Sequence, residues 1–311
     1  MGKTHPISAA GSGYEWTYLL SNYMFGAPIG NVWYVLSGAG TDAGGGSRGL
    51  SPEAPLATID YAVGLCVANN DDVIVVLPGH AETLSAAGAI TVDVAGVTIL
   101  GMGSRSNRPT LSFAHTAATF AISAANVTVK NLRVTATVDE AVKLFHVTAA
   151  GCTIDGVDYF ETTSAQALQF LLTTNAADHL TIQNCYHRQD NAGGSAQNWI
   201  ALIGVDDARI LDNTFLLTLN NAAASYTIGA TTAVINCHIA RNTIIQLGGT
   251  TQVSAIFLTT SSTGFVHDNR VASAFTIIAG SVALASAFGA ENYCVNTVNK
   301  SGILDPVADN L

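Results

Sequence analysis

The chain carries β-branched residues at a nearly constant interval. An isoleucine or valine recurs about every 28 residues, a length that suits one coil of a stacked solenoid. Each lies in a short phrase that alternates apolar and polar residues, which places it on the inner face of a strand. The positions are Ile99, Val129, Ile154, Ile182, Ile210, Ile239, Val266 and Val295. Because the repeat has no heptad or paired-helix pattern, it predicts a β-solenoid of about eight coils with these residues in one internal column.

Each coil is expected to turn at an asparagine or a glycine, since these residues tolerate left-handed backbone and end the alternation. The corner residues are Gly101, Asn131, Gly156, Asn184, Asn213, Asn242 and Asn269. From Ile210 onward the corner lies three residues after the column position instead of two, which predicts an added corner residue in the later coils. Stacked asparagines are expected to hydrogen-bond to one another along the solenoid, which is a structural role.

Residues 57–68 form the one convincing helix of the sequence. Thr58 is a suitable N-cap, and Ile59, Ala62, Val63 and Cys66 fall on one face. Such a helix, placed just before a solenoid, can cover the open edge of its first coil. Strands are predicted at 32–35 and 73–77. The glycine-rich loop 38–49 does not open a helix, so we exclude a nucleotide-binding site there.

Composition limits the possible partners. Only 11% of the residues are charged, against a usual share of about 25%, so the chain is ordered and its surface is either polar and uncharged or covered in an oligomer. A net charge of −10 with 12 Lys+Arg argues against nucleic acid. The uncharged stretch 271–290 is interpreted as buried coil rather than a membrane span, because Gly280 and several serines interrupt it. The five cysteines are expected to be buried, reduced thiols.

The sequence divides into four parts. Residues 1–30 lie outside the repeat, 31–80 hold the first strand, the glycine-rich loop and the capping helix, 81–300 form the β-helix, and 301–311 are a tail. The first part is rich in aromatic residues, and two interpretations remain open: a lid packed on the first coil, or an arm that docks on a partner. The candidate docking residues are Tyr14, Trp16, Tyr18, Tyr23 and Phe25.

No catalytic or metal constellation stands out. Hydrolysis of a polysaccharide needs two suitably spaced carboxylates, and the candidates are Asp139, Glu140, Asp155, Asp158, Glu161, Asp178, Asp190, Asp206, Asp207, Asp212 and Asp268. No pair of them recurs one coil apart on a polar face. Asp155 is expected to share a corner with Asn184, and Asp212 to form a solvated ion pair with Arg241.

The eight histidines are scattered and are expected at the surface, with residues 187–191 in a polar loop. His238 and His267 lie one coil apart, but their opposite offsets from the column leave open whether they share a face. Two ligands are too few for a typical zinc site. We therefore predict no catalytic residues, no metal and no cofactor.

Several motifs resemble a known class. Trp33-Tyr34-Val35, Gly49-Leu50-Ser51-Pro52 and Val75-Val76-Leu77-Pro78-Gly79 resemble the first coils of right-handed parallel β-helix proteins of the pectin-lyase-like class. Gly101-Met102-Gly103, Arg108-Pro109-Thr110 and Phe288-Gly289-Ala290-Glu291-Asn292-Tyr293 resemble the β-helix proteins of tailed bacteriophages. The resemblance covers residues 31–300. It implies an all-β fold, a right-handed parallel β-helix, and a homotrimer.

The resemblance favours a non-enzymatic structural protein of a phage virion. The leading hypothesis is a trimeric capsid decoration or cement protein, assembled in the host cytoplasm and attached by its N-terminal region to the major capsid protein or another virion protein. The alternative is a tailspike-type receptor-binding protein that binds or cleaves host surface polysaccharide. A free polysaccharide lyase is a weaker hypothesis, because it would need a secretion signal that the first residues do not resemble.

Overall fold

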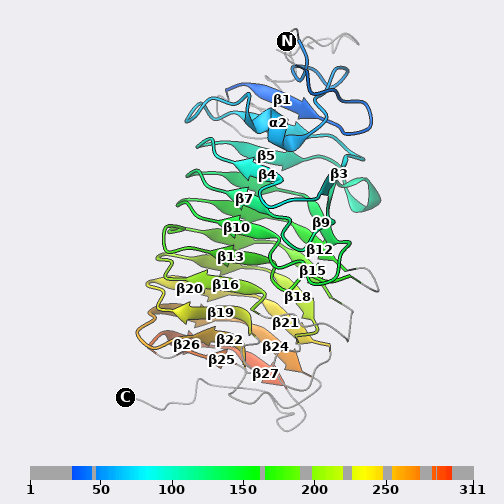
Figure 1. Cartoon of the computed structure of the whole chain (residues 1–311). Helices are drawn as coiled ribbons and strands as arrows, with labels where there is room; N and C mark the ends of the chain where they lie inside the picture. Colours follow the sequence, from blue (N-terminus) through cyan, green and yellow to red (C-terminus); the bar gives the residue numbers. More distant parts are fainter. Residues whose placement is uncertain are drawn as a thin grey trace, which may run out of the picture.

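The chain forms a parallel β-solenoid, seen here in a computed structural model (Figure 1). The structure describes residues 30–43, 47–161, 165–189, 198–219, 226–247, 254–273, 282–284 and 286–295. All of the strand pairing in these residues is parallel, and each strand pairs with the strands one coil before and one coil after it. The fold class predicted from the repeat, an all-β parallel β-helix, is confirmed.

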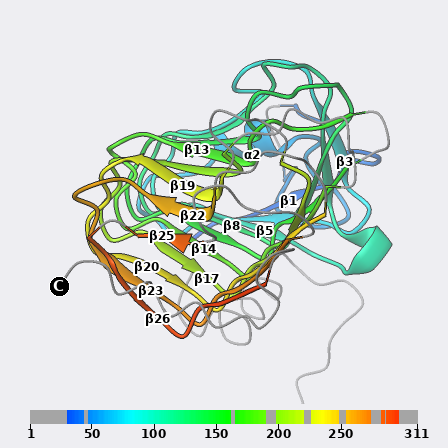
Figure 2. The ribbon, with the colours of Figure 1, turned by 90° about the horizontal axis from the view of Figure 1, so that it is seen from below.

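Three sheets run along the solenoid and enclose its core (Figure 2). Sheet A holds β1 (Val32–Val35), β2 (Val73–Val76), β5 (Thr98–Gly101), β8 (Thr128–Lys130), β11 (Thr153–Asp155), β14 (Thr181–Gln183), β17 (Arg209–Leu211), β20 (Cys237–Ala240), β23 (Gly264–His267) and β26 (Phe288–Ala290).

Sheet B follows sheet A in each coil. Its strands are β3 (Ala81–Leu84), β6 (Thr110–Phe113), β9 (Arg133–Ala136), β12 (Asp158–Phe160), β15 (Tyr186–Arg188), β18 (Thr214–Leu217), β21 (Thr243–Gln246), β24 (Arg270–Ser273) and β27 (Tyr293–Val295). Sheet C holds β4 (Ile90–Val92), β7 (Phe120–Ile122), β10 (Phe145–Val147), β13 (Leu171–Thr173), β16 (Ile200–Ile203), β19 (Tyr226–Thr232), β22 (Ser254–Leu258) and β25 (Val282–Ala283). A short 3-10 helix, η2 (Arg105–Asn107), precedes β6.

The predicted internal column exists in sheet A. Ile99, Val129, Ile154, Ile182, Ile210, Ile239 and Val266 are register partners in successive strands and are fully buried. Val295 was wrongly assigned to the column: it lies in β27 of sheet B and is exposed, and the partner of Val266 is Gly289. The last coil is shorter than the others, so the expected spacing passes over a glycine and reaches the next sheet.

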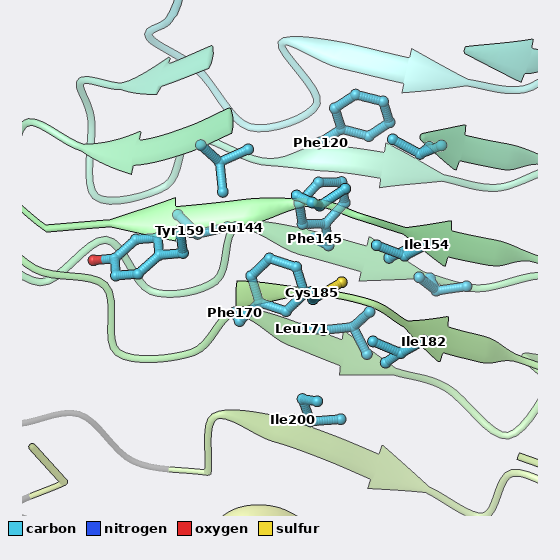
Figure 3. Close-up of a cluster of buried hydrophobic side chains, with 14 of the residues drawn as sticks. Phe120, Leu144, Phe145, Ile154, Tyr159, Phe170, Leu171, Ile182, Cys185 and Ile200 are labelled. Atoms are coloured by element: carbon cyan, nitrogen blue, oxygen red, sulfur yellow. The ribbon is translucent and has the colours of Figure 1, made fainter. Parts of the chain in front are cut away.

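Side chains from all three sheets fill the interior. Phe120, Phe145 and Phe170 stack along the solenoid with ring centroids 5.0 and 5.1 Å apart, beside the Ile154–Ile182 pair of the column (Figure 3). A buried column of this kind supplies most of the stability of the fold, because each coil exposes its apolar edge until the next coil covers it.

The corners between sheets A and B differ from the prediction. From Asn131 onward the residue in left-handed backbone is the second after the column position, as in Asn184, Asp212, Arg241 and Asp268, with φ between 55° and 57°; Gly101, also a predicted corner residue, does not have a positive φ. No residue is added in the later coils. The asparagine one position further on points inward instead, because its amide can satisfy the backbone groups that the turn leaves unpaired.

These inward asparagines form the predicted ladder. Asn213, Asn242, Asn269 and Asn292 are buried, and the Nδ2 of each of the first three donates to the Oδ1 of the next at 2.9 Å. Each Oδ1 also accepts a backbone N–H from the coil before, as Asn242 does from Asn213 at 3.1 Å. Asn292 was not among the predicted corner residues. In earlier coils the equivalent places are apolar, with Leu132, Val157 and Cys185.

The predicted helix is present but shorter than 57–68. Helix α2 (Ile59–Val63) begins at Thr58, whose Oγ1 accepts the N–H of Tyr61 at 3.3 Å, and it contacts β4, β1 and β2. Its Asp60 accepts the backbone N–H of Thr91 in β4 at 2.8 Å, on the edge of sheet C that no strand covers. The helix ends at Val63, and the next bonds, from the N–H of Leu65 and of Cys66, are of the tighter i→i+3 kind; the buried Asp72 carboxylate then accepts the N–H of Val67 at 2.7 Å.

The cysteines are free thiols, and four of them are buried as expected: Cys152, Cys185, Cys237 and Cys294. Burial raises the pKa of Cys185 to about 12 and that of Cys237 to about 11, which keeps both thiols protonated and unreactive. Among the described residues, no helix combines the length and the hydropathy needed to cross a bilayer.

Candidate functional site

The predicted docking residues cannot be placed. Tyr14, Trp16, Tyr18, Tyr23 and Phe25 all lie outside the described residues, so the choice between lid and arm stays a prediction. The candidate functional surface therefore has to be found on the solenoid itself.

The candidate carboxylates are held singly rather than in pairs. Asp155 accepts from Lys130 Nζ at 2.9 Å and from Asn184 Nδ2 at 2.8 Å, so the expected shared corner with Asn184 exists. Asp158 pairs with Arg108 at 2.5 Å. Asp190 lies outside the described residues.

Several of the remaining candidates are also held singly. Arg241 donates two hydrogen bonds to the Asp212 carboxylate, at 2.7 and 2.6 Å, and this is the ion pair expected from the sequence. Asp207 lies 3.2 Å from His179 Nδ1, and Asp178 accepts the N–H of Asp206 at 2.9 Å. Asp139 and Glu140 are exposed at a turn.

These pairings lower carboxyl pKa values. Burial alone would raise the pKa of Asp155, but hydrogen bonds from Asn184 and Lys130 outweigh it and hold that pKa below its usual range. The bond from Arg241 lowers the pKa of Asp212, and the bond from His267 lowers that of Asp268. A general acid in glycoside hydrolysis needs the opposite shift. These three carboxylates are therefore unsuited to that role.

A hollow lies on the outer face of sheet A near the C-terminal end. Its volume is about 550 Å³, and it opens across β17, β20, β23 and β26. Its lining combines imidazole, guanidinium, carboxylate and phenyl groups. The lining residues are Asp207, Arg209, Asn236, Cys237, His238, Thr263, Gly264, Phe265, His267 and Phe288.

Two histidines meet in this hollow. His238 Nε2 and His267 Nε2 are 2.8 Å apart, and His267 Nδ1 lies 2.7 Å from Asp268 Oδ2. Both rings leave sheet A on its outer face, since one residue precedes the buried Ile239 and the other follows the buried Val266. Burial, the neighbouring His267 and two arginines lower the pKa of His238. The question left open by the sequence is thus settled: offsets of −1 and +1 differ by two residues, so the side chains share a face.

An exposed aromatic pair continues the same row. Phe265 is 61% exposed and Phe288 is 73% exposed, and their rings stack with centroids 5.9 Å apart. They are register partners of each other and of His238. This exposed apolar pair makes the row a candidate interaction surface.

The outer row of sheet A changes character along the solenoid. Threonine occupies it in β5, β8, β11 and β14, followed by arginine, histidine and two phenylalanines in β17, β20, β23 and β26. The row is Thr98, Thr128, Thr153, Thr181, Arg209, His238, Phe265 and Phe288. A plain polar surface thus gives way to a chemically varied one at the C-terminal end.

A second, smaller hollow lies on sheet C. It has a volume of about 400 Å³, and Thr119, Ala121, Lys143 and His146 are among its lining residues. Burial and the neighbouring Lys143 lower the pKa of His146, so this imidazole is neutral at pH 7. No carboxylate is among the described residues that line this hollow, so it is chemically less varied than the hollow on sheet A.

Two histidines expected at the surface are buried. His187 is fully buried in β15 rather than in a polar loop, and the side chain of His80 is also inaccessible. His187 Nδ1 accepts Trp199 Nε1–H at 2.7 Å, and its Nε2 contacts the Val157 carbonyl oxygen at 3.2 Å. Burial lowers the pKa of His187 to about 3, so the ring is a neutral part of the core. Its place in the inner column of sheet B, between Tyr159 and Phe215, explains the error.

Comparison with known proteins gives fold neighbours only. No protein-family model and no curated protein matches the chain. A solved rhamnogalacturonan lyase is similar at a TM-score of 0.48 and 13% identity over 88% of both chains. A GH136 lacto-N-biosidase from Eubacterium ramulus is similar at a TM-score of 0.35 and 9% identity over 90% of this chain and 70% of that one. At these values neither likeness bears on activity, and the fold assignment rests on the strand pairing itself.

Proposed function

We propose that the protein is a non-enzymatic structural component of a tailed-phage virion, a homotrimeric capsid decoration protein attached through its N-terminal region. The single observation that carries the non-enzymatic part is the state of the carboxylates. The described candidates with an ion-pair partner are held one at a time, by Lys130, Arg108, Arg241 or a hydrogen-bonded histidine. A polysaccharide hydrolase needs two carboxylates facing one substrate bond with pKa values set apart.

The proposal has two further supports. The sequence motifs of the first and last coils resemble phage β-helix proteins, and a solenoid with a continuous buried column is a rigid body suited to an exposed position on a particle. Few charges and several exposed apolar side chains at the C-terminal end are also compatible with contact between copies.

Copy number in purified particles tests this function. Quantitative mass spectrometry should find the protein in an amount comparable to the major capsid protein, and the isolated protein should sediment at about three times the 32.1 kDa chain mass. Absence from the particles contradicts the proposal. Deletion of residues 1–30 should leave a folded solenoid that no longer binds particles lacking the protein; loss of folding would instead identify this segment as a lid.

A second function is favoured by one specific observation. The exposed Phe265–Phe288 stack lies along an open hollow that also presents Arg209 and His238, an arrangement suited to a glycan chain with apolar ring faces and polar edges. In that case the protein is a receptor-binding component that binds host surface polysaccharide. A few trimers per particle, and loss of polysaccharide binding in Phe288→Ala but not in Val142→Ala, would support this alternative. Val142 is an exposed apolar residue at the other hollow.

A further inference from the structure

Neither proposed function explains why the imidazoles of His238 and His267 converge. They come from adjacent strands β20 and β23, and their Nε2 atoms approach to 2.8 Å. Their ring centroids are 5.0 Å apart with planes 25° apart, so the two rings meet tip to tip. Both Nε2 atoms are therefore directed at the same small volume.

Asp268 orients the imidazole of His267. Its Oδ2 lies 2.7 Å from Nδ1, and because a carboxylate oxygen accepts, Nδ1–H donates to it and Nε2 is directed toward His238. A carboxylate that accepts from the far nitrogen of a histidine orients the ring and raises its basicity, and this is the usual outer partner of a metal-bound histidine. His267 is therefore held in an orientation that presents Nε2 beside His238 Nε2.

The surroundings leave room for an ion and its water ligands. Both histidines line the hollow of about 550 Å³, and both side chains are partly exposed. With metal–nitrogen bonds of about 2.0–2.1 Å, a tetrahedral ion needs the two nitrogens about 3.3 Å apart, an opening of about half an ångström. Partly exposed imidazoles reach that separation by small rotations about χ1 and χ2.

The nearby charges are balanced. Arg241, which lies close enough to affect His238, is neutralised by its two bonds to Asp212. Arg209 also lines the hollow, and Asp207 and Asp268 carry the opposite charge beside it. The cation-repelling and cation-attracting groups therefore offset each other.

We propose that His238 and His267 bind one divalent transition-metal ion of the class that prefers imidazole, with water molecules as the other ligands. Among the described residues, no third histidine, cysteine, aspartate or glutamate joins the group, so the site is open and of moderate affinity. Imidazole ligands select Cu²⁺, Ni²⁺ and Zn²⁺ over Mg²⁺ and Ca²⁺, with Cu²⁺ bound most tightly. A bound ion would link β20 to β23 across the coil boundary and stabilise the C-terminal coils.

The test uses the full chain without a polyhistidine tag. Calorimetric titration should give one Cu²⁺ per chain, weaker binding of Zn²⁺ and none of Mg²⁺. His238→Ala and His267→Ala should each abolish this binding, and Asp268→Asn should weaken it by about tenfold. His179→Ala is the matched control, because His179 is also an exposed histidine beside a carboxylate but has no second imidazole; it should bind as the wild type does.

Spectroscopy gives a readout that a purely structural role would not change. Electron paramagnetic resonance of the Cu²⁺ form should show hyperfine coupling to two imidazole nitrogens, and the wild-type melting temperature should rise with Cu²⁺ while that of His238→Ala does not. Binding that persists in the double variant His238→Ala/His267→Ala, coupling to one nitrogen only, or no binding by the wild type would each overturn the proposal.

Discussion

Removal of one rung of the asparagine ladder gives the sharpest test of the fold. The Asn242 side chain makes four hydrogen bonds and is fully buried. Its Oδ1 accepts from the backbone N–H and from Nδ2 of Asn213 at 3.1 and 2.9 Å, and its Nδ2 donates to the Ile210 carbonyl at 2.8 Å and to Asn269 Oδ1 at 2.9 Å.

Asn242→Ala removes the acceptor of the Asn213 backbone N–H and of one of its two Nδ2 hydrogens, while the other Nδ2 hydrogen keeps its bond to the Ile182 carbonyl at 3.0 Å. Each buried, unsatisfied polar group costs about 1–3 kcal/mol, so we expect a loss of about 4 kcal/mol. The matched control is Asn184→Gly. It removes an amide that makes one partly exposed bond, to Asp155 at 2.8 Å, and keeps the left-handed backbone at φ 56°; it should cost less than about 1 kcal/mol.

The assay is urea unfolding followed by circular dichroism, combined with hydrogen exchange of β20 and β21. Since coils of a solenoid interact mainly with their neighbours, protection should fall most in the coils on either side of residue 242. Equal losses in Asn242→Ala and Asn184→Gly, or a loss of protection spread evenly along the chain, would refute the reasoning.

Three further predictions follow from the core and the turns. Ile182→Ala should cost about 2–5 kcal/mol in urea unfolding because it opens a cavity in the buried column, whereas Thr181→Ala on the outer face should cost less than about 1 kcal/mol; similar values for the two would contradict the column. The pKa of His187 is about 3 in the folded state and about 6.5 in the unfolded state, so between these values the unfolded chain binds more protons. The free energy of unfolding therefore decreases as the pH is lowered. The loss from this residue should begin below pH 6.5 and reach about 2 kcal/mol by pH 5, and a profile flat from pH 7 to 5 would show that the ring titrates normally. Gly264→Ala should prevent accumulation of soluble protein, since its Cβ would lie 2.1 Å from a backbone oxygen of the neighbouring strand; Gly156→Ala, at a left-handed corner with open space around it, should lose only about 1–2 kcal/mol, and equal yields of the two would reject the close contact.

The fold could be predicted from the sequence because every coil of a solenoid meets the same packing requirement. The inward isoleucine or valine recurs wherever a coil has the standard length, so seven of the eight positions stack as expected. The prediction failed at Val295, where the last coil shortens and glycine takes the inward place. The period alone carries no signal for a shortened coil.

The corners and the histidines show a different limit. Asparagine was taken as the left-handed residue in the later coils, but Asp212 and Arg241 adopt that conformation and the asparagines turn inward. Propensity favours asparagine at both places, and only the hydrogen bonds between coils decide between them. By contrast, the shared face of His238 and His267 could have been found from the even difference between their offsets. The Phe265–Phe288 stack depends on the shortened last coil and was beyond sequence reasoning.

At the corners between sheets A and B, apolar residues in the early coils give way to asparagine in the later coils. Neighbouring coils are therefore joined in two different ways. In the N-terminal half, Leu132 and Val157 require only that a neighbour of the right size sits above and below. From Asn213 onward, each coil is joined to the one before it by a directional hydrogen bond between two asparagine amides. A coil of this second kind brings its own donor and acceptor, so duplicating the coil that contains Asn242 should lengthen the protein by one unit without disturbing the joins on either side.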